Sequence, residues 1–237
     1  MSRCALLFAL LASFFLAASP ATAATETATD NPWRLAAKAR SPADISLWTR
    51  TVPGAQLKAF RGATHVEVPM ESVTAFLHDT EAMTHWVFRC KEARILAEHD
   101  DGTMYVHLKI DGIWPLEDRD AVVKVIPDLV PATGELRLIG VAAPDYLPPQ
   151  PDHIRIPSIE STWLMRPGAN GLLYVEWSGH VDPAGNVPRW LANTLVTLVP
   201  RYTLKHMREL VADPKWRQPA QREFGHLLIE RVRNNAR

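Results

Sequence analysis

The sequence has no excess of charge of either sign and little glycine. Lys and Arg together number 26, as do Asp and Glu, so the formal net charge is zero. Nonspecific nucleic-acid binding requires a basic excess that neutralises phosphates, so we expect no nucleic-acid partner. Only 11 glycines stand against 19 prolines, which favours short, punctuated elements over a long helical bundle.

Signatures of catalytic and metal sites are also missing. The chain contains no G-x-S-x-G, no Walker loop, no G-x-G-x-x-G and no H-E-x-x-H. No two of its nine histidines have the i, i+4 spacing at which one helix face holds a metal ion. We therefore predict no catalytic residue, no metal site and no cofactor, and expect the chain not to be an enzyme.

The first 23 residues have the pattern of a secretory signal peptide. Arg3 precedes an apolar, small-residue run from 5 to 18, and Ala21-Thr22-Ala23 matches a leader-peptidase site. The run is shorter than the ~20 residues that span a membrane. We predict cleavage after Ala23 and export to the periplasm or the medium. An uncleaved anchor or a buried first helix is the alternative.

Cysteine is nearly absent from the predicted mature chain. Cleavage would remove Cys4 and leave Cys90 alone, so no internal disulfide could form and the fold would depend on its core. His85 and His99 are close in sequence, but the surrounding residues do not match a catalytic thiol site. Cys90 is predicted to be a buried structural thiol.

Hydrophobic periodicity predicts an α+β fold. Residues 24–50 are interpreted as a linker with a short helix at 32–39. Helices are expected at 71–78 and 187–211, where Pro200 should kink or split the second, and an amphipathic stretch follows at 221–233. Strands are expected at 57–61, 64–68, 92–98, 103–111, 120–128, 135–141, 159–166 and 172–181. This order predicts a curved antiparallel sheet covered by a long C-terminal helix.

The strand expected at 103–111 alternates clearly between two faces. Val106, Leu108 and Ile110 share one apolar face. The positions between them, including His107, fall on the other face, which we expect to meet solvent.

Tryptophan is abundant, with eight in the chain. Two interpretations remain open: packing in the core, or aromatic lining of an apolar cavity or membrane-touching rim.

Two motifs carry a family resemblance. Residues 113–120 read I-W-P-L-E-D-R-D and resemble the P-W-P-L-x-D-R-D motif of START domains, the steroidogenic-acute-regulatory-related lipid-transfer family. Residues 182–193 read D-P-A-G-N-V-P-R-W-L-A-N and resemble that family's D-P-G-G-x-I-P-x-W-L-x-N. The resemblance spans about residues 56–210, with further similarity at Thr203-Leu204 and Met207-Arg208, and at Trp86 with Lys91.

The resemblance implies a helix-grip fold, with an antiparallel sheet gripping the C-terminal helix around a hydrophobic tunnel. It implies a START-like lipid-binding domain over 51–237 that binds and possibly transfers a lipid or sterol-like molecule. Export, predicted from the first 23 residues, is unusual beside the cytosolic members of the family and suggests a bacterial envelope protein. The implied partners are that ligand and, transiently, a membrane surface. A monomer is expected.

Two sets of site residues follow from the resemblance combined with the strand and helix faces. The predicted cavity wall comprises Val106, Leu108, Ile110, Val123, Val125, Leu138 and Trp163 from the sheet, with Trp190, Leu191, Thr194, Leu195 and Leu198 from the helix. Motif residues expected to be structural, with Arg119 and Asp120 clamping the entry of a strand, are Trp114, Pro115, Arg119, Asp120, Asp182, Pro183, Gly185 and Pro188. The loop at 144–151 and the start of the last helix are the predicted gate.

Departures from the family pattern keep other functions open. Animal sterol carriers of the family place a charged pair in the cavity, whereas the matching positions here are Leu108 and Val125. A helix-grip enzyme, such as a cyclase or hydrolase, would need a polar cluster in the cavity. Its nearest candidates, Tyr174, Glu176 and His180, fall on the opposite face from Trp177. A ligand-free envelope interaction module with a filled core is the third hypothesis.

Overall fold

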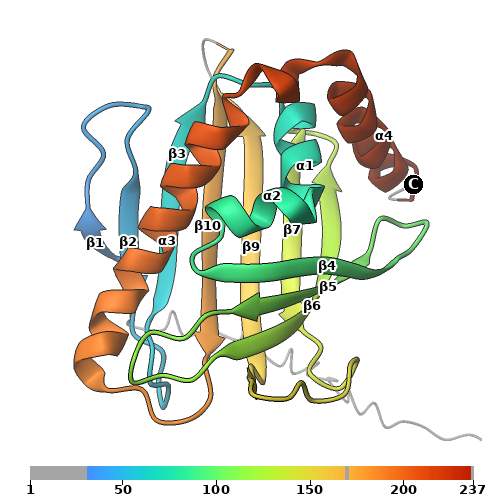
Figure 1. Cartoon of the computed structure of the whole chain (residues 1–237). Helices are drawn as coiled ribbons and strands as arrows, with labels where there is room; N and C mark the ends of the chain where they lie inside the picture. Colours follow the sequence, from blue (N-terminus) through green and yellow to red (C-terminus); the bar gives the residue numbers. More distant parts are fainter. Residues whose placement is uncertain (1–30, 169–170, 236–237) are drawn as a thin grey trace, which may run out of the picture. The chain divides into compact units, whose positions relative to one another are not determined.

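The centre of the protein is one large, curved sheet (Figure 1). The computed structural model describes residues 31–168 and 171–235, so the predicted signal peptide at 1–23 lies outside the described residues. The strands follow the order β1-β2-β3-β10-β9-β7-β6-β5-β4, and all these neighbours are antiparallel, while β8 pairs with β6 in parallel. Their bounds are β1 Arg34–Ala37, β2 Ser46–Arg50, β3 Ala59–Val66, β4 Cys90–Glu98, β5 Met104–Ile110, β6 Arg119–Val130, β7 Glu135–Ala142, β8 Ile154–Arg155, β9 Ser158–Pro167 and β10 Leu173–Asp182.

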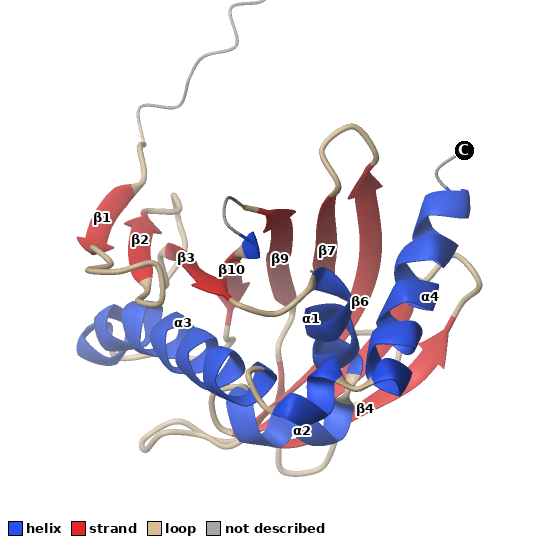
Figure 2. Cartoon of the chain, turned by 90° about the horizontal axis from the view of Figure 1, so that it is seen from above, coloured by secondary structure: helices blue, strands red, loops and turns tan. Residues whose placement is uncertain are grey.

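The helices lie in the hollow of this sheet (Figure 2). They are α1 Met70–His78, α2 Thr80–Trp86, the long α3 Arg189–Val211, a 3₁₀ turn at Pro214–Arg217, and α4 Pro219–Asn235. Asp79 separates the first two, because its side chain caps α2 by accepting a hydrogen bond from the Ala82 amide at 2.9 Å. The predicted α+β plan, an antiparallel sheet with a long C-terminal helix, is confirmed.

The N-terminal segment differs from its predicted linker and short helix. Residues 34–37 form strand β1 instead of a helix, and β1 and β2 add two strands to the edge of β3. Leu47 of β2 is fully buried in the main core. Pairing with β2 therefore overrides the helix propensity of the short R-L-A-A segment.

Close packing of α3 on the sheet explains two further corrections. The strands predicted at 57–61 and 64–68 are one continuous strand, β3, which runs through Gly62. A Cβ atom at Gly62 would lie 2.5 Å from Leu204 Cδ1, so the glycine is a point of close approach for α3 and not a turn. Pro200 sits within α3 without splitting it, and its buried ring also faces Gly62.

The main core occupies part of the space between the sheet and the helices. Phe76 of α1, Leu204 and Met207 of α3 and Trp216 are buried together there. Cys90 is also buried, and this burial raises the pKa of its thiol to about 11. The predicted burial of this cysteine is confirmed, and the thiol form persists at neutral pH.

Candidate functional site

A cavity of about 350 Å³ lies between the concave face of the sheet and the helices. This volume falls within the range of small-ligand pockets, roughly 300–1,000 Å³. Apolar side chains make up nearly all of its wall. The polar side chains on the wall are few and scattered: Lys58, Thr74, His78, Ser161 and Thr203.

Strand alternation builds the long wall of this cavity. Met104, Val106, Leu108 and Ile110 of β5 all line it, so the wall follows the whole strand. Six residue steps at ~3.3 Å each give a length of about 20 Å. Neighbouring strands add further predicted residues to the wall: Val123 and Val125 of β6, Leu138 of β7 and Trp163 of β9. Leu108 and Val125 both line the cavity, so the wall is apolar at these two positions.

An aromatic row crosses the strands of the wall. Phe60 of β3 meets Trp177 of β10 edge to face at 4.6 Å, and Trp177 stacks on its cross-strand neighbour Trp163 at 5.2 Å. Trp86 of α2 completes the row, edge to face with Trp163 at 5.7 Å. All four rings line the cavity. Three of the tryptophans therefore line the cavity. Trp163 was predicted to do so, whereas Trp86 and Trp177 were not.

The helical wall uses a different face of α3 from the predicted one. Leu195 lines the cavity as predicted, together with Val196, Val199 and Thr203. The other predicted helix residues do not: Trp190 is 61% exposed, Thr194 and Leu198 are exposed, and Leu191 is buried in a separate cluster with Val187. Apolar residues occur around much of this helix, and its contact with β3 selects the face that turns inward.

The far end of the cavity is closed by α4. Leu228, Ile229 and Val232 of this helix line it, and the sequence analysis did not assign them to the site. Their i, i+1, i+4 spacing within the amphipathic stretch is the signal that could have identified them.

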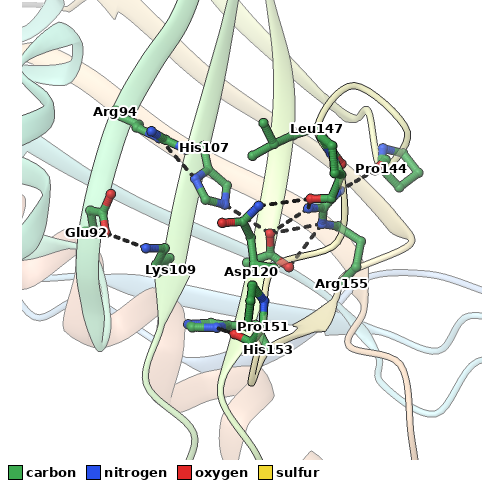
Figure 3. A network of polar contacts seen from close by, with 12 residues as sticks. Glu92, Arg94, His107, Lys109, Asp120, Pro144, Leu147, Pro151, His153 and Arg155 are labelled. Atoms are coloured by element: carbon green, nitrogen blue, oxygen red, sulfur yellow. Dashed lines mark hydrogen bonds and ion pairs between the residues drawn. The ribbon is translucent and has the colours of Figure 1, made fainter.

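Behind the wall, the outer face of β5 and β6 holds a buried polar network (Figure 3). His107 was expected to meet solvent but is only 1% exposed, and Asp120 is fully buried. Arg94 Nε donates to His107 Nδ1 at 3.4 Å, which leaves Nε2 to carry the proton donated to Asp120 Oδ2 at 3.0 Å. Arg155 Nε also donates to both Asp120 oxygens at 3.0 Å.

Arg155 also anchors the proline-rich loop at residues 144–153, which covers this face. Its guanidinium donates to the carbonyls of Pro144, Leu147 and Pro148, and Tyr146 of the loop stacks on Tyr105 of β5. None of residues 144–153 lines the cavity, so the structure places the loop predicted as a gate away from the cavity wall. These contacts hold the loop beside the outer face on which His107 is buried.

The network sets the charge state of Asp120. Burial by itself raises the pKa of this carboxyl, but hydrogen bonds from Arg155 and His107 outweigh burial, and the pKa lies below its ordinary value. Asp120 is therefore a buried carboxylate with matched donors.

Arg119 joins the two sequence motifs. Its buried side chain donates from Nε to the Pro183 carbonyl at 3.4 Å and from Nη1 to the Glu117 carbonyl, and Gly185 lies beside its guanidinium. The second motif forms a tight turn, in which Asp182 accepts from the Ala184 amide at 2.9 Å and Pro188 precedes α3. These contacts give the motif residues structural roles at the start of β6 and of α3.

Trp114 and Pro115 differ from the other motif residues. They are joined by a cis peptide bond in the 111–118 loop, and the Trp114 side chain is 86% exposed. Ile113 and Leu116 of the same loop pack against the start of α3, near Leu191. The loop and the helix start therefore lie together at the end of the cavity opposite α4.

The candidate residues of the enzyme hypothesis do not face the cavity. Tyr174 donates its hydroxyl to Glu176 at 2.7 Å, and Glu176 pairs with Arg61 on the outer side of β10. His180 is likewise absent from the cavity wall. Within residues 31–168 and 171–235, no group of three or more His, Cys, Asp or Glu side chains could hold a metal ion. Across the same residues, no helix is both long enough and apolar enough to cross a membrane.

An antiparallel sheet that grips a long helix around an apolar cavity defines the class of helix-grip proteins that enclose hydrophobic molecules. The sequence agrees, because the family model for the START domain matches residues 18–217. The chain belongs to the START domain family.

Individual proteins resemble this chain in structure or in sequence. A STAR-related lipid transfer protein from Xanthomonas axonopodis is 30% identical, superposes with a TM-score of 0.68, and is matched over 76% of this chain and 98% of its own. Human STARD10 has the same TM-score at 20% identity, over 84% of this chain and 81% of its own. An uncharacterized protein of Pseudomonas aeruginosa is 29% identical over 74% of this chain and 85% of its own length.

Proposed function

We propose that the protein holds one lipid-like molecule with an acyl chain in the cavity and carries it between membranes. The observation that supports this most strongly is the continuous apolar wall along β5, about 20 Å long. One leaflet of a bilayer contributes about 15 Å of hydrocarbon, half of the ~30 Å core. The cavity is thus long enough for one extended acyl chain.

The energetics favour transport of a lipid between membranes over its tight retention by the protein. Removing each methylene from water gains about 0.8 kcal/mol, so a sixteen-carbon chain gains on the order of 12 kcal/mol in a dry cavity. Relative to a bilayer interior the gain is near zero, because both surroundings are apolar. Such a cavity lowers the barrier to crossing water while leaving lipid free to return to a membrane.

We propose that the end formed by the 111–118 loop and the start of α3 touches the membrane. Trp114 and Trp190 are the two most exposed tryptophans, at 86% and 61%, and tryptophan favours the boundary between water and hydrocarbon. Leu57 and Leu195 connect this end to the cavity, because both line it and both pack with the loop cluster. We propose that this activity takes place outside the cytoplasm, because the first 23 residues have the pattern of a signal peptide.

Catalysis has no part in this proposal. Among the described residues, the cavity wall contains one charged side chain, Lys58, and one histidine, His78. The Nε2 atom of His78 is held by Glu98 at 3.1 Å. No two wall residues in the described part of the chain form the acid and base pair that hydrolysis or cyclisation needs.

The test is loading from vesicles. The purified chain is incubated with phosphatidylcholine and phosphatidylglycerol vesicles, separated from them by gel filtration, and analysed by native mass spectrometry. We expect one lipid per chain, together with faster movement of fluorescent lipid between donor and acceptor vesicles. A chain that remains empty and leaves the transfer rate unchanged would refute the proposal.

A further inference from the structure

The helix that closes the cavity lies outside the family domain. The START match ends at residue 217, and α4 begins at Pro219. Nevertheless Leu228, Ile229 and Val232 of α4 are buried and line the cavity. A segment added after the family domain thus supplies part of the wall of the binding site.

Contacts fix α4 closely against the rest of the fold. Its main contact is α1, where Gly225 lies against the backbone of Glu71 so tightly that a Cβ atom would not fit. Arg231 Nη1 donates to Glu98 Oε1 at 2.6 Å, and Glu98 Oε2 also binds His78. The helix therefore holds a defined position instead of lying loosely on the surface.

The position of α4 is at the end of the long wall. A Cβ atom placed on Gly102, in the turn before β5, would lie 3.0 Å from Pro127 and 3.3 Å from Val232. Met104, the first cavity residue of β5, follows two positions later. Val232 therefore meets the sheet where the run of β5 wall residues begins, about 20 Å along the strand from Ile110.

The polar groups at the two ends indicate which end receives the methyl terminus. At the α4 end, His78 Nε2 and both Glu98 oxygens already have partners. At the opposite end, the exposed ammonium of Lys58 has no hydrogen-bond or ion-pair partner among the described residues. A polar headgroup can bind at Lys58, which leaves the apolar α4 end for the chain terminus.

We propose that α4 determines the acyl-chain length that the protein accepts, with Leu228, Ile229 and Val232 forming the floor under the terminal methyl group. This inference rests on the proposed lipid-binding function. A chain too long for the floor must leave methylenes in water at the open end, and each costs about a fourfold loss in affinity, the equivalent of ~0.8 kcal/mol.

The experiment compares chain-length profiles of the full-length protein. Wild type is offered an equimolar mixture of saturated fatty acids with ten to twenty carbons, and bound acids are quantified by native mass spectrometry. Leu228→Ala and Val232→Ala deepen the floor and should move the preferred length upward. Ile229→Trp raises the floor and should move it downward, with several-fold changes in the ratio of long to short acids.

Leu227→Ala is the matched control, because Leu227 belongs to the same helix but is 54% exposed. Its profile should equal that of wild type. Circular dichroism checks folding, and Ile229→Phe is the milder enlargement that should still shorten the preferred length if Ile229→Trp does not fold.

The possible outcomes distinguish the role of α4 in chain-length selection from the proposed lipid-binding function. Folded proteins that all bind fatty acids with one unchanged profile would overturn the role of α4 and leave lipid binding intact. If wild type binds neither these acids nor vesicle lipids, the proposed function itself fails.

Discussion

The two faces of β5 and β6 contrast sharply, although alternate residues of the same strands supply both. On the inner face, Val106 and Val123 border open apolar space. On the outer face, His107 and Asp120 are packed without exposure beneath the proline-rich loop. A cavity forfeits packing contacts that a filled core would have. We infer that the outer network compensates by holding the strands where inner packing cannot.

Removing the carboxylate of Asp120 from the buried network should cause the largest loss of stability. Asp120→Ala leaves Arg155 and His107 buried without their acceptor, and breaking a buried ion pair in this way costs roughly 3–5 kcal/mol. The free energy of unfolding, measured by urea titration, should fall by that order. Asp118→Ala is the control, because Asp118 pairs with Lys91 near solvent; an equal loss in both variants would contradict the special role of the buried network.

Filling the inner face should abolish function with little loss of stability. Leu195→Trp inserts an indole into the cavity, so lipid loading should fall at least tenfold while the melting temperature changes by only a few degrees. Leu198→Trp lies on the exposed side of the same helix and should load normally. Normal loading by Leu195→Trp would move the binding site elsewhere.

Substitutions at the proposed membrane-facing end should change the rate of lipid transfer but not the amount of lipid bound. Trp114→Ala combined with Trp190→Ala should slow lipid transfer between vesicles several-fold, because two interfacial anchors are lost. The amount of lipid bound at equilibrium should remain that of wild type. Tyr146→Ala alters an exposed aromatic residue of the outer loop and serves as control; equal slowing there would argue against a localised docking end.

The smallest expected effect is the loss of folding stability at low pH. The native pKa of Asp120 is lowered from its ordinary 3.8, so the unfolded chain binds the proton more readily and folding stability rises with pH across that interval. The contribution of Asp120 is complete above about pH 4 to 5 and is lost as the pH falls through the lowered native value. Urea unfolding between pH 7 and 2.5 should show a steeper acid loss for wild type than for Asp120→Asn; parallel curves would contradict this linkage.

The sequence was sufficient to predict the inner, cavity-lining face of β5 but not the burial of its outer face. Alternation along residues 104–110 placed Val106, Leu108 and Ile110 on the cavity wall, because strand geometry sends alternate side chains to opposite faces. The same rule placed His107 opposite them but could not show that this side chain is buried. Arg155, which organises that loop, is 35 residues from Asp120 in the chain, and no local pattern connects them.

Helix faces were harder to predict for a related reason. Apolar residues surround much of α3, so its periodicity could not reveal that Val196 and Val199 face inward while Trp190 and Leu198 face solvent. The contact at Gly62 determines that rotation, and it is tertiary. Similarly, the amphipathic pattern of α4 identified a helix without showing that its apolar face closes a cavity.

The most direct test of the central claim is contact between a bound acyl chain and the aromatic row. Trp86, Trp163 and Trp177 line the cavity, and bromine on an acyl chain quenches indole fluorescence on contact. The complex with a mid-chain brominated lipid is isolated from vesicles, and its fluorescence is compared with that of the unbrominated complex. We predict quenching of the cavity tryptophans that largely disappears when Trp86, Trp163 and Trp177 are all replaced by phenylalanine; bound lipid with undiminished tryptophan emission in the wild type would contradict the claim that the chain occupies this cavity.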